Sequence, residues 1–381
     1  MKHLHRAWAE IDLDALIHNF NEIKKSTKSK VCCVVKANAY GHSVDPIVKL
    51  LEKSGADLFA VSNIDEAKEL RELGINKPVL ILGYTPVSFV DELVKYSIIQ
   101  TVFSFEYAQK LSLEAQKLGK IVEAHLKLDT GMSRLGFDCR SAELNGLAEI
   151  KDVLRLKGLD LKGIFTHFPS ADSYEPSDRE ETLSQYDRFI KAIKILGKDG
   201  TKFEMCHCCN SAATILYPNM HLDAIRPGII LYGLTPSVDI KPTLNLKPVM
   251  SFKSAVSMVK ELDKDQTVSY GRTYKAEKPV KIATVSVGYA DGYPRILSGK
   301  GSVIVNGKEA SIVGRVCMDQ VCIDVTDIAD VKEGDIVTLF GEGLPVEKLA
   351  KEAQTINYEI VCGLSKRVPR FLIKDGQEID S

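Results

Sequence analysis

An alternation of short apolar runs with helix-like stretches over the first 233 residues constrains the fold most strongly. Short apolar runs of this kind are typical of parallel strands that are buried on both faces, and the intervening amphipathic stretches are typical of covering helices. The expected strands lie at residues 31–36, 58–62, 78–82, 98–102, 121–128, 161–168, 203–207 and 222–233. Eight strand–helix units can close into a barrel. The sequence therefore predicts an α/β fold with an eight-stranded (β/α)8 TIM-type barrel.

The pattern changes after Gly233, where strand-like runs follow one another with one helix-like interruption at 345–354. Asn306-Gly307 marks a tight hairpin, because both residues tolerate the positive φ angles of a type I′ turn. A chain of 381 residues is also long for a single hydrophobic core. We therefore predict a second domain of mostly antiparallel β structure.

The predicted domain boundaries place the barrel at residues 1–238 and the β-rich domain at 239–381. Residues 1–10 are a candidate strand of the β-rich domain rather than of the barrel.

The charge balance excludes some classes of function. Fifty basic against fifty-one acidic side chains give a net charge of −1, whereas nucleic-acid and membrane-surface proteins usually carry a basic excess. No apolar run approaches the roughly 20 residues that span a bilayer. The start, MKHLHRAWAEIDLD, lacks the apolar core of a secretory signal. We expect no nucleic-acid partner, no membrane partner and a cytoplasmic location.

Nine cysteines occur at irregular spacings, and one cluster, Cys206-His207-Cys208-Cys209, is a candidate metal site. A zinc site usually needs a second ligand pair at a suitable spacing, and the sequence offers none. Cysteines inside apolar runs also behave as small buried hydrophobic residues. We therefore favour core packing for this cluster and expect no metal.

Lys36 is the first candidate for chemistry, because it directly follows an apolar strand. Barrel enzymes place their sites where strands end and the following loops begin. A lysine there could simply reach solvent. Alternatively, a desolvated pocket with other cations would lower its pKa and make it a nucleophilic Schiff-base lysine.

Polar side chains follow four further predicted strands. Taken singly, His167 is more often a structural histidine and Arg134 a surface cation. The loops after strands seven and eight of such barrels often bind phosphate, and Ser211 and Gly228 lie there. A reactive lysine together with a phosphate site is what pyridoxal 5'-phosphate requires. The strand-end residues are Lys127, Arg134, His167, Asn210, Ser211 and Arg226.

Ordered motifs then connect the chain with a known family. They run from residue 8 to residue 370 and include VVKANAYGH, HLKLDTGMSRLG, THF, NSAA, RPGIILYG, VSYGRTY, VGYADGYPR, GRVCMDQ and INYE. In this order they resemble the motifs of bacterial alanine racemase, a pyridoxal-phosphate-dependent isomerase. The resemblance implies a barrel-plus-β homodimer whose sites are shared between subunits. It also implies interconversion of L-alanine and D-alanine, which supplies D-alanine for the peptidoglycan of the cell wall.

The resemblance also implies roles for individual residues. Lys36 would hold the cofactor and serve as the base on the D-alanine face, and Tyr270 would be the base on the L-alanine face. The cofactor would contact Tyr40, His167, Asn210, Ser211, Arg226, Gly228, Ile229 and Tyr358. The substrate carboxylate would bind Arg134 and the backbone amide of Met318. Supporting or entry positions would be Lys127, Asp172, Tyr289, Arg295 and Asp319.

Two of these roles have a simple physical reason. Arg226 cannot give up its proton, so a pyridine nitrogen facing it stays unprotonated and is a weaker electron sink. An unperturbed tyrosine side chain has a pKa of about 10, which is too high for a base near neutral pH, so the role that the resemblance implies for Tyr270 requires nearby cations. Arg134 and Arg295 are the candidates.

Three alternatives remain at this stage. Decarboxylases of basic amino acids share the architecture, but they face the ring nitrogen with a carboxylate, unlike Arg226. A non-catalytic pyridoxal-phosphate-binding barrel would lack the β-rich domain and Tyr270. A racemase of broad specificity, acting on serine or lysine, would differ from an alanine racemase only in the volume of its substrate pocket, which a sequence does not show.

Overall fold

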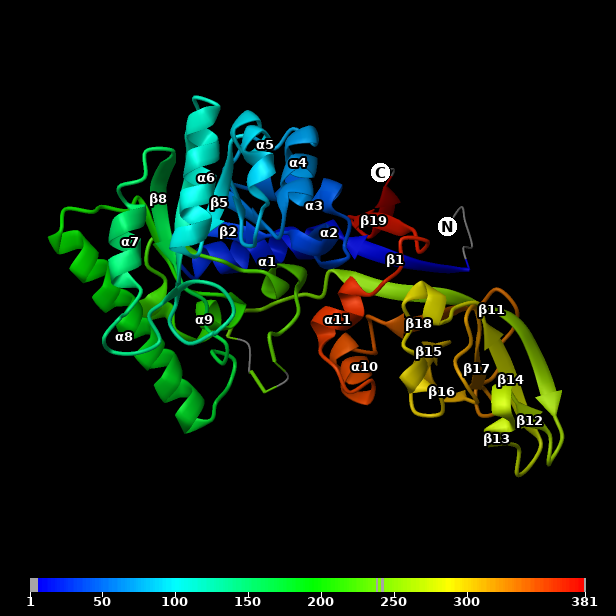
Figure 1. Cartoon of the computed structure of the whole chain (residues 1–381). Coiled ribbons are helices and arrows are strands. Elements are labelled where there is room, and N and C mark those ends of the chain that lie inside the picture. The colour runs from blue at the N-terminus through cyan, green and yellow to red at the C-terminus, as the bar shows by residue number, and fades with distance from the viewer. Residues whose placement is uncertain (1–5, 238, 241–242, 380–381) are drawn as a thin grey trace. The chain divides into compact units, whose positions relative to one another are not determined.

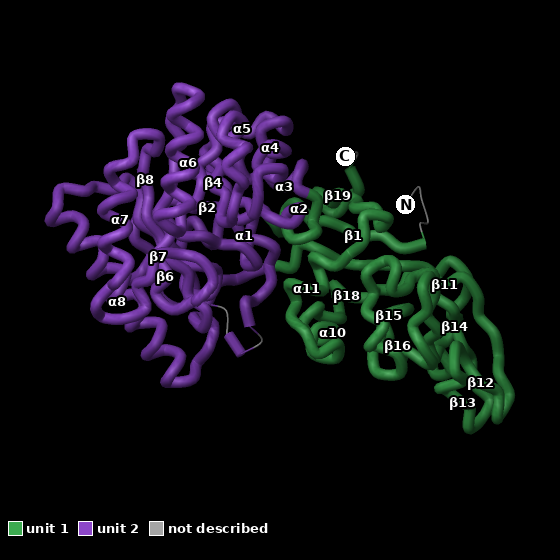
Figure 2. Tube along the Cα trace, viewed as in Figure 1, with its two compact units in different colours: residues 1–16, 40–43, 247–381 green, residues 17–39, 44–246 purple. Residues whose placement is uncertain are grey.

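The computed structural model describes residues 6–237, 239–240 and 243–379. The chain divides into two compact units (Figure 2). We call residues 17–39 and 44–246 the barrel unit, and residues 1–16, 40–43 and 247–381 the β unit. The boundary predicted at 238/239 falls on residue 238, outside the described residues, and it stays a prediction.

The barrel unit contains a closed parallel sheet, as predicted (Figure 1). Each strand pairs in parallel with its neighbours, and the pairing of β10 with β2 closes the ring. Within the described residues the eight barrel strands are β2 (Lys30–Val34), β3 (Leu58–Val61), β4 (Val79–Ile81), β5 (Ile98–Val102), β6 (Val122–Asp129), β8 (Leu159–Phe165), β9 (Met205–His207) and β10 (Ala224–Ile225). A short strand, β7 (Phe137–Asp138), pairs with β6.

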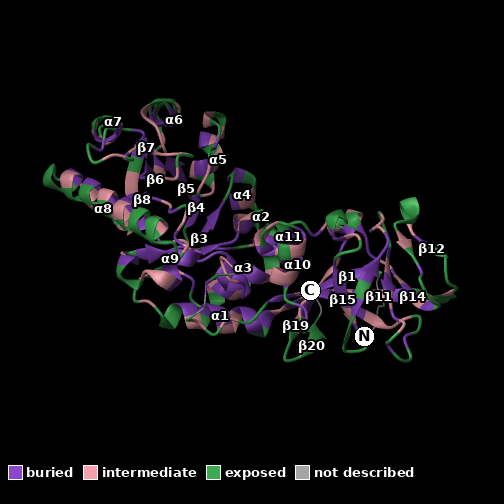
Figure 3. Ribbon diagram, turned by 90° about the horizontal axis from the view of Figure 1, so that it is seen from below, coloured by how far each residue is buried: buried purple, intermediate pink, exposed green. Residues whose placement is uncertain are grey.

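Amphipathic helices alternate with these strands, and Figure 3 shows their mixture of buried and exposed residues. Side-chain caps start two of them: Asn63 accepts from the Glu66 amide, and Ser104 accepts from the Tyr107 amide. None of the described helices is long and apolar enough to cross a membrane. The helices are α1 (Leu13–Lys25), α3 (Val44–Lys53), α4 (Ile64–Glu72), α5 (Val90–Lys95), α6 (Phe105–Lys117), α7 (Leu147–Val153), α8 (Pro176–Lys198) and α9 (Ser211–Leu216).

The β unit is mostly antiparallel, as predicted, and is built around the long strand β11 (Met250–Leu262). β11 pairs with β1 (Ala7–Asp12), which also pairs in parallel with β19 (Arg370–Lys374). The other strands of this sheet are β14 (Val280–Val285), β15 (Ser302–Val305), β16 (Lys308–Val313), β17 (Val321–Asp324), β18 (Ile336–Phe340) and β20 (Gln377–Ile379). Two helices, α10 (Val346–Glu352) and α11 (Asn357–Cys362), belong to the same unit.

The predicted hairpin is confirmed between β15 and β16. Val305 lies opposite Lys308, and the two residues between them have φ angles of 47° at Asn306 and 72° at Gly307. Both angles are positive, as a type I′ turn requires.

Candidate active site

The strand ends of the barrel carry the predicted polar residues. Lys36 begins α2 (Lys36–Tyr40), a single turn that follows β2. His167 follows β8, and Arg226 directly follows β10. Because the carboxyl ends of parallel barrel strands meet at one end of the barrel, these three side chains share that end.

Four cations influence one imidazole at this end of the barrel. Burial lowers the pKa of His167 well below its usual value, and the positive charges of Arg226, Lys127, Arg134 and Lys36 lower it further. His167 is therefore uncharged near neutral pH. The structure thus brings these four predicted residues together into a positively charged site, which favours an anionic ligand.

Lys127 lies on β6 and is 4% exposed. Burial, and then the charges of Arg226 and Arg134, lower its pKa to about 7, although Asp129 opposes the shift. Its ammonium group also lies 5.3 Å from the centre of the Phe165 ring. Close to neutral pH this side chain is therefore divided between its charged and uncharged forms.

This shift predicts a pH dependence of stability. The folded protein releases the Lys127 proton near pH 7, whereas the unfolded chain keeps it up to the ordinary value of 10.5. Between these values the unfolded chain binds more protons, so the free energy of unfolding rises with pH, by at most about 1.4 kcal/mol per pH unit. Below pH 7 the folded protein and the unfolded chain both bind the proton, so the contribution of Lys127 to the free energy of unfolding no longer changes with pH. Urea denaturation at several pH values, in buffer free of carbon dioxide, measures the slope.

Lys127→Met is the comparison, because methionine has a similar length and no charge. Its free energy of unfolding should lack this rise between pH 7 and 10.5 while other titrating groups contribute equally in both proteins. Equal slopes for the two proteins would show that Lys127 keeps an ordinary pKa.

Arg226 is buried and has only uncharged partners among the hydrogen bonds described for it. Its Nη1 bonds Nδ1 of His207 at 2.7 Å, and its Nη2 donates to the carbonyl oxygens of Thr166 at 2.7 Å and Cys208 at 3.1 Å. Nδ1 of His167 lies 3.4 Å from the same Nη2. These contacts hold the guanidinium plane without neutralising its charge.

His207 extends this arrangement to His125. A guanidinium only donates, so Nδ1 of His207 accepts and its Nε2 carries the proton. That Nε2 then donates to Nδ1 of His125, at 3.0 Å. Burial, and secondarily the charge of Arg226, lower the pKa of His125 to about 4 and that of His207 well below its usual value. Both imidazoles therefore stay neutral beside Arg226.

Sequence reasoning treated His207 only as part of a cysteine cluster and missed His125. Gly163 leaves room for the His125 ring, since a Cβ there would lie 2.4 Å from it. Core packing is confirmed for Cys208 and Cys209, which are both buried. In the part of the chain that the structure describes, no disulfide joins cysteines and no group of His, Cys, Asp and Glu is arranged to hold a metal.

The loops after β9 and β10 are joined by a hydrogen bond. Asn210 caps α9 by accepting from the Ala213 amide at 3.0 Å, and Ser211 Oγ accepts from the Gly228 amide at 2.8 Å. Ile229 then begins a buried 3-10 turn, η3 (Ile229–Tyr232). Hydroxyl and amide donors thus gather in the two loops where barrels often bind phosphate.

The Arg134 loop is held from both sides. Asp129 Oδ1 accepts from the Ser133 amide at 2.9 Å, and Arg188 Nη2 on α8 donates to the Thr130 carbonyl at 2.8 Å. Arg134 itself is exposed. Sequence reasoning missed Arg188, because nothing in a helical sequence shows that its side chain reaches a loop 58 residues away.

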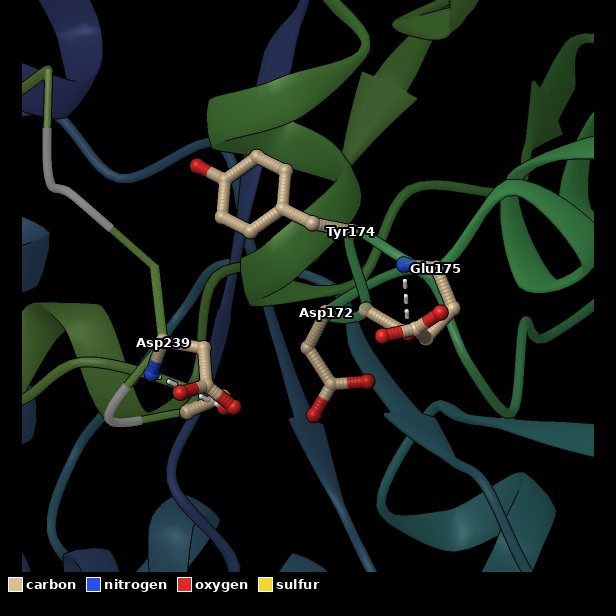
Figure 4. A pocket seen from close by; sticks show the side chains of 6 residues that line it. Asp172, Tyr174, Glu175 and Asp239 are labelled. Atoms are coloured by element: carbon tan, nitrogen blue, oxygen red, sulfur yellow. Dashed lines mark hydrogen bonds between the residues drawn. The ribbon is translucent and has the colours of Figure 1, made fainter.

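Asp172 lies in a separate hollow of the barrel unit, with a volume of about 220 Å³ (Figure 4). The hollow is lined by Asp172, Ser173, Tyr174, Glu175, Ser237 and Asp239. Three carboxylates make it acidic, in contrast to the positively charged site at Lys36. The entry role of Asp172 stays a prediction.

In the β unit, two predicted phosphate contacts lie together. The rings of Tyr40 and Tyr358 are 6.0 Å apart and inclined by 51°. Gly41 allows this approach, because a Cβ there would lie 2.2 Å from the Val361 carbonyl. Arg370 Nε also donates to the Gly41 carbonyl at 3.1 Å. Residues 40–43 are thus attached to α11 and β19.

Two loops of the β unit bring Tyr289 and Met318 together. The Tyr289 amide donates to the Cys317 carbonyl at 3.0 Å, and the Ala290 amide donates to the Met318 carbonyl at 3.1 Å. A Cβ on Gly288 would lie 2.3 Å from these carbonyls, so glycine is required for the approach. Met318 is 53% exposed and Tyr289 is 42% exposed.

Two arginines tie the same loops together through Asp291 and Asp319. The carboxylate of Asp291, 1% exposed, accepts from Arg6 Nη1 at 2.5 Å and from Arg367 Nε at 2.8 Å. Arg367 Nη2 also donates to Asp319 at 2.7 Å, and Arg6 Nη2 donates to the Asp319 carbonyl at 2.9 Å. Asp319, predicted as a supporting residue, thus holds the loop that carries Met318. Sequence reasoning missed Arg6, Asp291 and Arg367.

Tyr270 is the most exposed large hydrophobic side chain described, at 72%, and begins the turn η4 (Tyr270–Arg272). Gly271 has a φ of 72°, and a Cβ on it would lie 3.2 Å from the Arg315 guanidinium. Arg295, also exposed, begins another turn, η6 (Arg295–Leu297). Arg315 is therefore a cation beside Gly271 that sequence reasoning did not name.

Comparisons with known proteins cover nearly the whole chain. The family model for the alanine racemase N-terminal domain matches residues 11–236, and the one for the C-terminal domain matches residues 249–372. The alanine racemase of Desulforamulus reducens is 45% identical over 370 residues, which cover 96% of this chain and 98% of that protein. The alanine racemase of Clostridium perfringens strain SM101 is 46% identical over 376 residues, which cover 97% of this chain and 96% of that protein.

Solved structures agree with these relatives. The alanine racemase of Clostridium difficile 630 has a TM-score of 0.93 and 39% identity, covering 100% of this chain and 98% of that one. The alanine racemase of Bacillus anthracis with bound L-Ala-P has a TM-score of 0.90 and 36% identity, with the same coverage. The chain therefore belongs to the alanine racemase family of isomerases.

Proposed function

We propose that this chain interconverts L-alanine and D-alanine with pyridoxal 5'-phosphate attached to Lys36. The observation that supports the proposal is the group of cations near His167: the charges of Arg226, Lys127, Arg134 and Lys36 all lower the pKa of this imidazole, and Arg226 Nη2 lies 3.4 Å from its Nδ1. Neighbouring positive charge favours the uncharged, nucleophilic form of a lysine amine. The same charge favours a ligand with a phosphate and a substrate with a carboxylate.

The residues present fit the cofactor. Ser211 Oγ and the amides of Gly228 and Ile229 would bind its phosphate, and the Ser211–Gly228 hydrogen bond supports their placement in one cradle. The paired rings of Tyr40 and Tyr358 would contribute their hydroxyl groups. His167 and Asn210 would orient the ring.

Arg226 would face the pyridine nitrogen. Its neutral partners, His207 and His167, leave its full positive charge in place, and it has no proton to release. The bound cofactor supplies an electron-withdrawing ring that acidifies the substrate's α-proton. A carboxylate at the position of Arg226 would favour the decarboxylase alternative instead.

Racemisation requires proton transfer on both faces of the substrate's α-carbon. Lys36 would move the proton on the D-alanine face, and the partner subunit's Tyr270 would do so on the L-alanine face. Arg134 and the Met318 amide would hold the substrate carboxylate. The hydrogen bonds of Asp129 and Arg188 to the Arg134 loop, and the arginine pairs on Asp319, support these two placements. Lys127 would support Arg134, and Asp172, Tyr289 and Arg295 would line the entry.

The proposal includes a homodimer whose sites are shared between subunits, as the family resemblance implies. In a cell, the D-alanine product would supply peptidoglycan synthesis in the cytoplasm. No nucleic acid or membrane takes part in the proposal.

The test is the near-ultraviolet and visible spectrum of the purified protein, followed by chiral analysis of alanine after adding L-alanine. We expect absorbance from bound cofactor and formation of D-alanine. L-serine and L-lysine in parallel reactions measure specificity. Absorbance without D-alanine would reopen the question of substrate, and no absorbance after adding pyridoxal phosphate would contradict the proposal.

A further inference from the structure

We propose that Glu66 is a positioning residue, which orients Lys36 by anchoring the left-handed turn that begins at this lysine. Glu66 lies on α4, in the strand–helix unit that follows Lys36. Its role toward the cofactor rests on the proposed function, whereas its anchoring of the turn does not.

The turn after Lys36 has an unfavourable backbone conformation. Ala37, Asn38 and Ala39 have φ angles of 54°, 54° and 53°, with ψ angles near 50° at all three. These values lie in the left-handed region, where the Cβ of an L-residue approaches the following carbonyl. Asparagine tolerates the region, but alanine does not favour it. Such a run persists only where the surrounding structure holds it.

Glu66 supplies contacts that hold this turn. Its Oε1 accepts from the Ala37 amide at 2.8 Å, and its Oε2 accepts from the Ser62 amide at 2.7 Å. One carboxylate thus joins the turn after β2 to the end of β3. Glu66 is itself held, because its amide donates to Asn63 Oδ1 at 3.0 Å in the cap of α4.

The Ala37 contact acts directly on Lys36. The carbonyl of Lys36 and the amide of Ala37 belong to one planar peptide unit. An acceptor fixed on that N–H therefore fixes the plane, and with it the ψ angle of Lys36. Another bond of the turn is local: the Ala39 amide donates to the Val35 carbonyl at 2.9 Å. The carboxylate of Glu66 adds an anchor from a helix to the residue next to Lys36.

The first test measures attachment of the cofactor rather than racemisation. Cofactor-free enzyme is mixed with pyridoxal 5'-phosphate, trapped with borohydride at timed intervals, and the label on Lys36 is quantified by peptide mass spectrometry. Glu66→Ala should slow this labelling about tenfold or more, the size expected for losing hydrogen bonds to a charged acceptor. The labelling rate of Glu66→Gln should lie between those of Glu66→Ala and the wild type, because the glutamine side chain keeps one acceptor oxygen.

Asp65→Asn is the matched control. This substitution removes one negative charge from the same turn of α4. Asp65 is exposed, and none of the described hydrogen bonds joins its side chain to the turn after Lys36. It should label at the wild-type rate. If the labelling rate of Asp65→Asn fell as far as that of Glu66→Gln, the effect would come from the charge on α4, and the proposal would be overturned.

The second test is independent of the cofactor. Hydrogen exchange at the Ala37 amide should speed up about tenfold or more in Glu66→Ala, whereas Asp65→Asn should exchange as the wild type does. Unchanged exchange and unchanged labelling in folded Glu66→Ala would overturn the proposal. If Glu66→Ala does not fold, Glu66→Gln decides by the same two measurements. If wild-type Lys36 takes no label but exchange changes, the proposed function fails while the anchoring stands.

Discussion

Replacing Lys36 with alanine should remove both the cofactor absorbance and nearly all racemisation. In the proposed function the Lys36 amine would both attach the cofactor and act as the base on the D-alanine face, so kcat/KM should fall by about 10,000-fold or more. Lys36 is only half-buried in a positively charged site, so its removal should leave the fold intact. Absorbance spectra and chiral product analysis measure the two losses.

Lys30→Ala is the matched control for this variant. Lys30 begins the same strand, β2, and its side chain is exposed. It should keep both the absorbance and the activity. If Lys36→Ala still bound the cofactor covalently, another lysine would be responsible and the assignment of Lys36 would be wrong.

Replacing Tyr270 with phenylalanine should separate the two proton transfers. The variant keeps the ring but lacks the phenolic oxygen, so racemisation should fall by about 100- to 10,000-fold, the usual contribution of a general base. Cofactor absorbance should remain. In heavy water, D-alanine should still exchange its α-proton through Lys36, whereas L-alanine should not. Proton NMR of each enantiomer measures the two exchange rates.

Tyr274→Phe is the control for Tyr270. Tyr274 lies in β13 (Tyr274–Lys275), which pairs with β12 (Thr267–Val268) on the other side of the turn that carries Tyr270. Its hydroxyl lies 3.5 Å from Asp324 Oδ2. It should racemise as the wild type does. Exchange of L-alanine at the normal rate in Tyr270→Phe would exclude Tyr270 as the base on that face.

The barrel could be predicted because its signal is local. Burial on both faces makes each parallel strand a short apolar run, and the expected strand at 98–102 coincides with β5. The helix-like interruption expected at 345–354 contains α10, because apolar residues at helical spacing reveal a helix from the sequence. β11 was missed, since much of it is exposed or half-buried and its apolar residues are interrupted by charges.

The site could be predicted only in part. Lys36, His167 and Arg226 stand at strand ends, and the barrel topology alone assigns them to one end of the sheet. The left-handed turn at Ala37 could not be predicted, because local preferences oppose it and only contacts such as the Glu66 carboxylate hold it. His125 was missed because its role depends on a partner 82 residues away.

The sequence was enough to predict the order of the barrel strands, the residue types at their ends and, through its ordered motifs, the family. Tertiary structure alone decided which distant side chains meet: His125 with His207, and Arg6 with Asp291, which are 285 residues apart. The physical reason is that burial periodicity and turn chemistry act over a few residues. Hydrogen bonds and pKa shifts depend instead on distances that exist only once the sheets have formed.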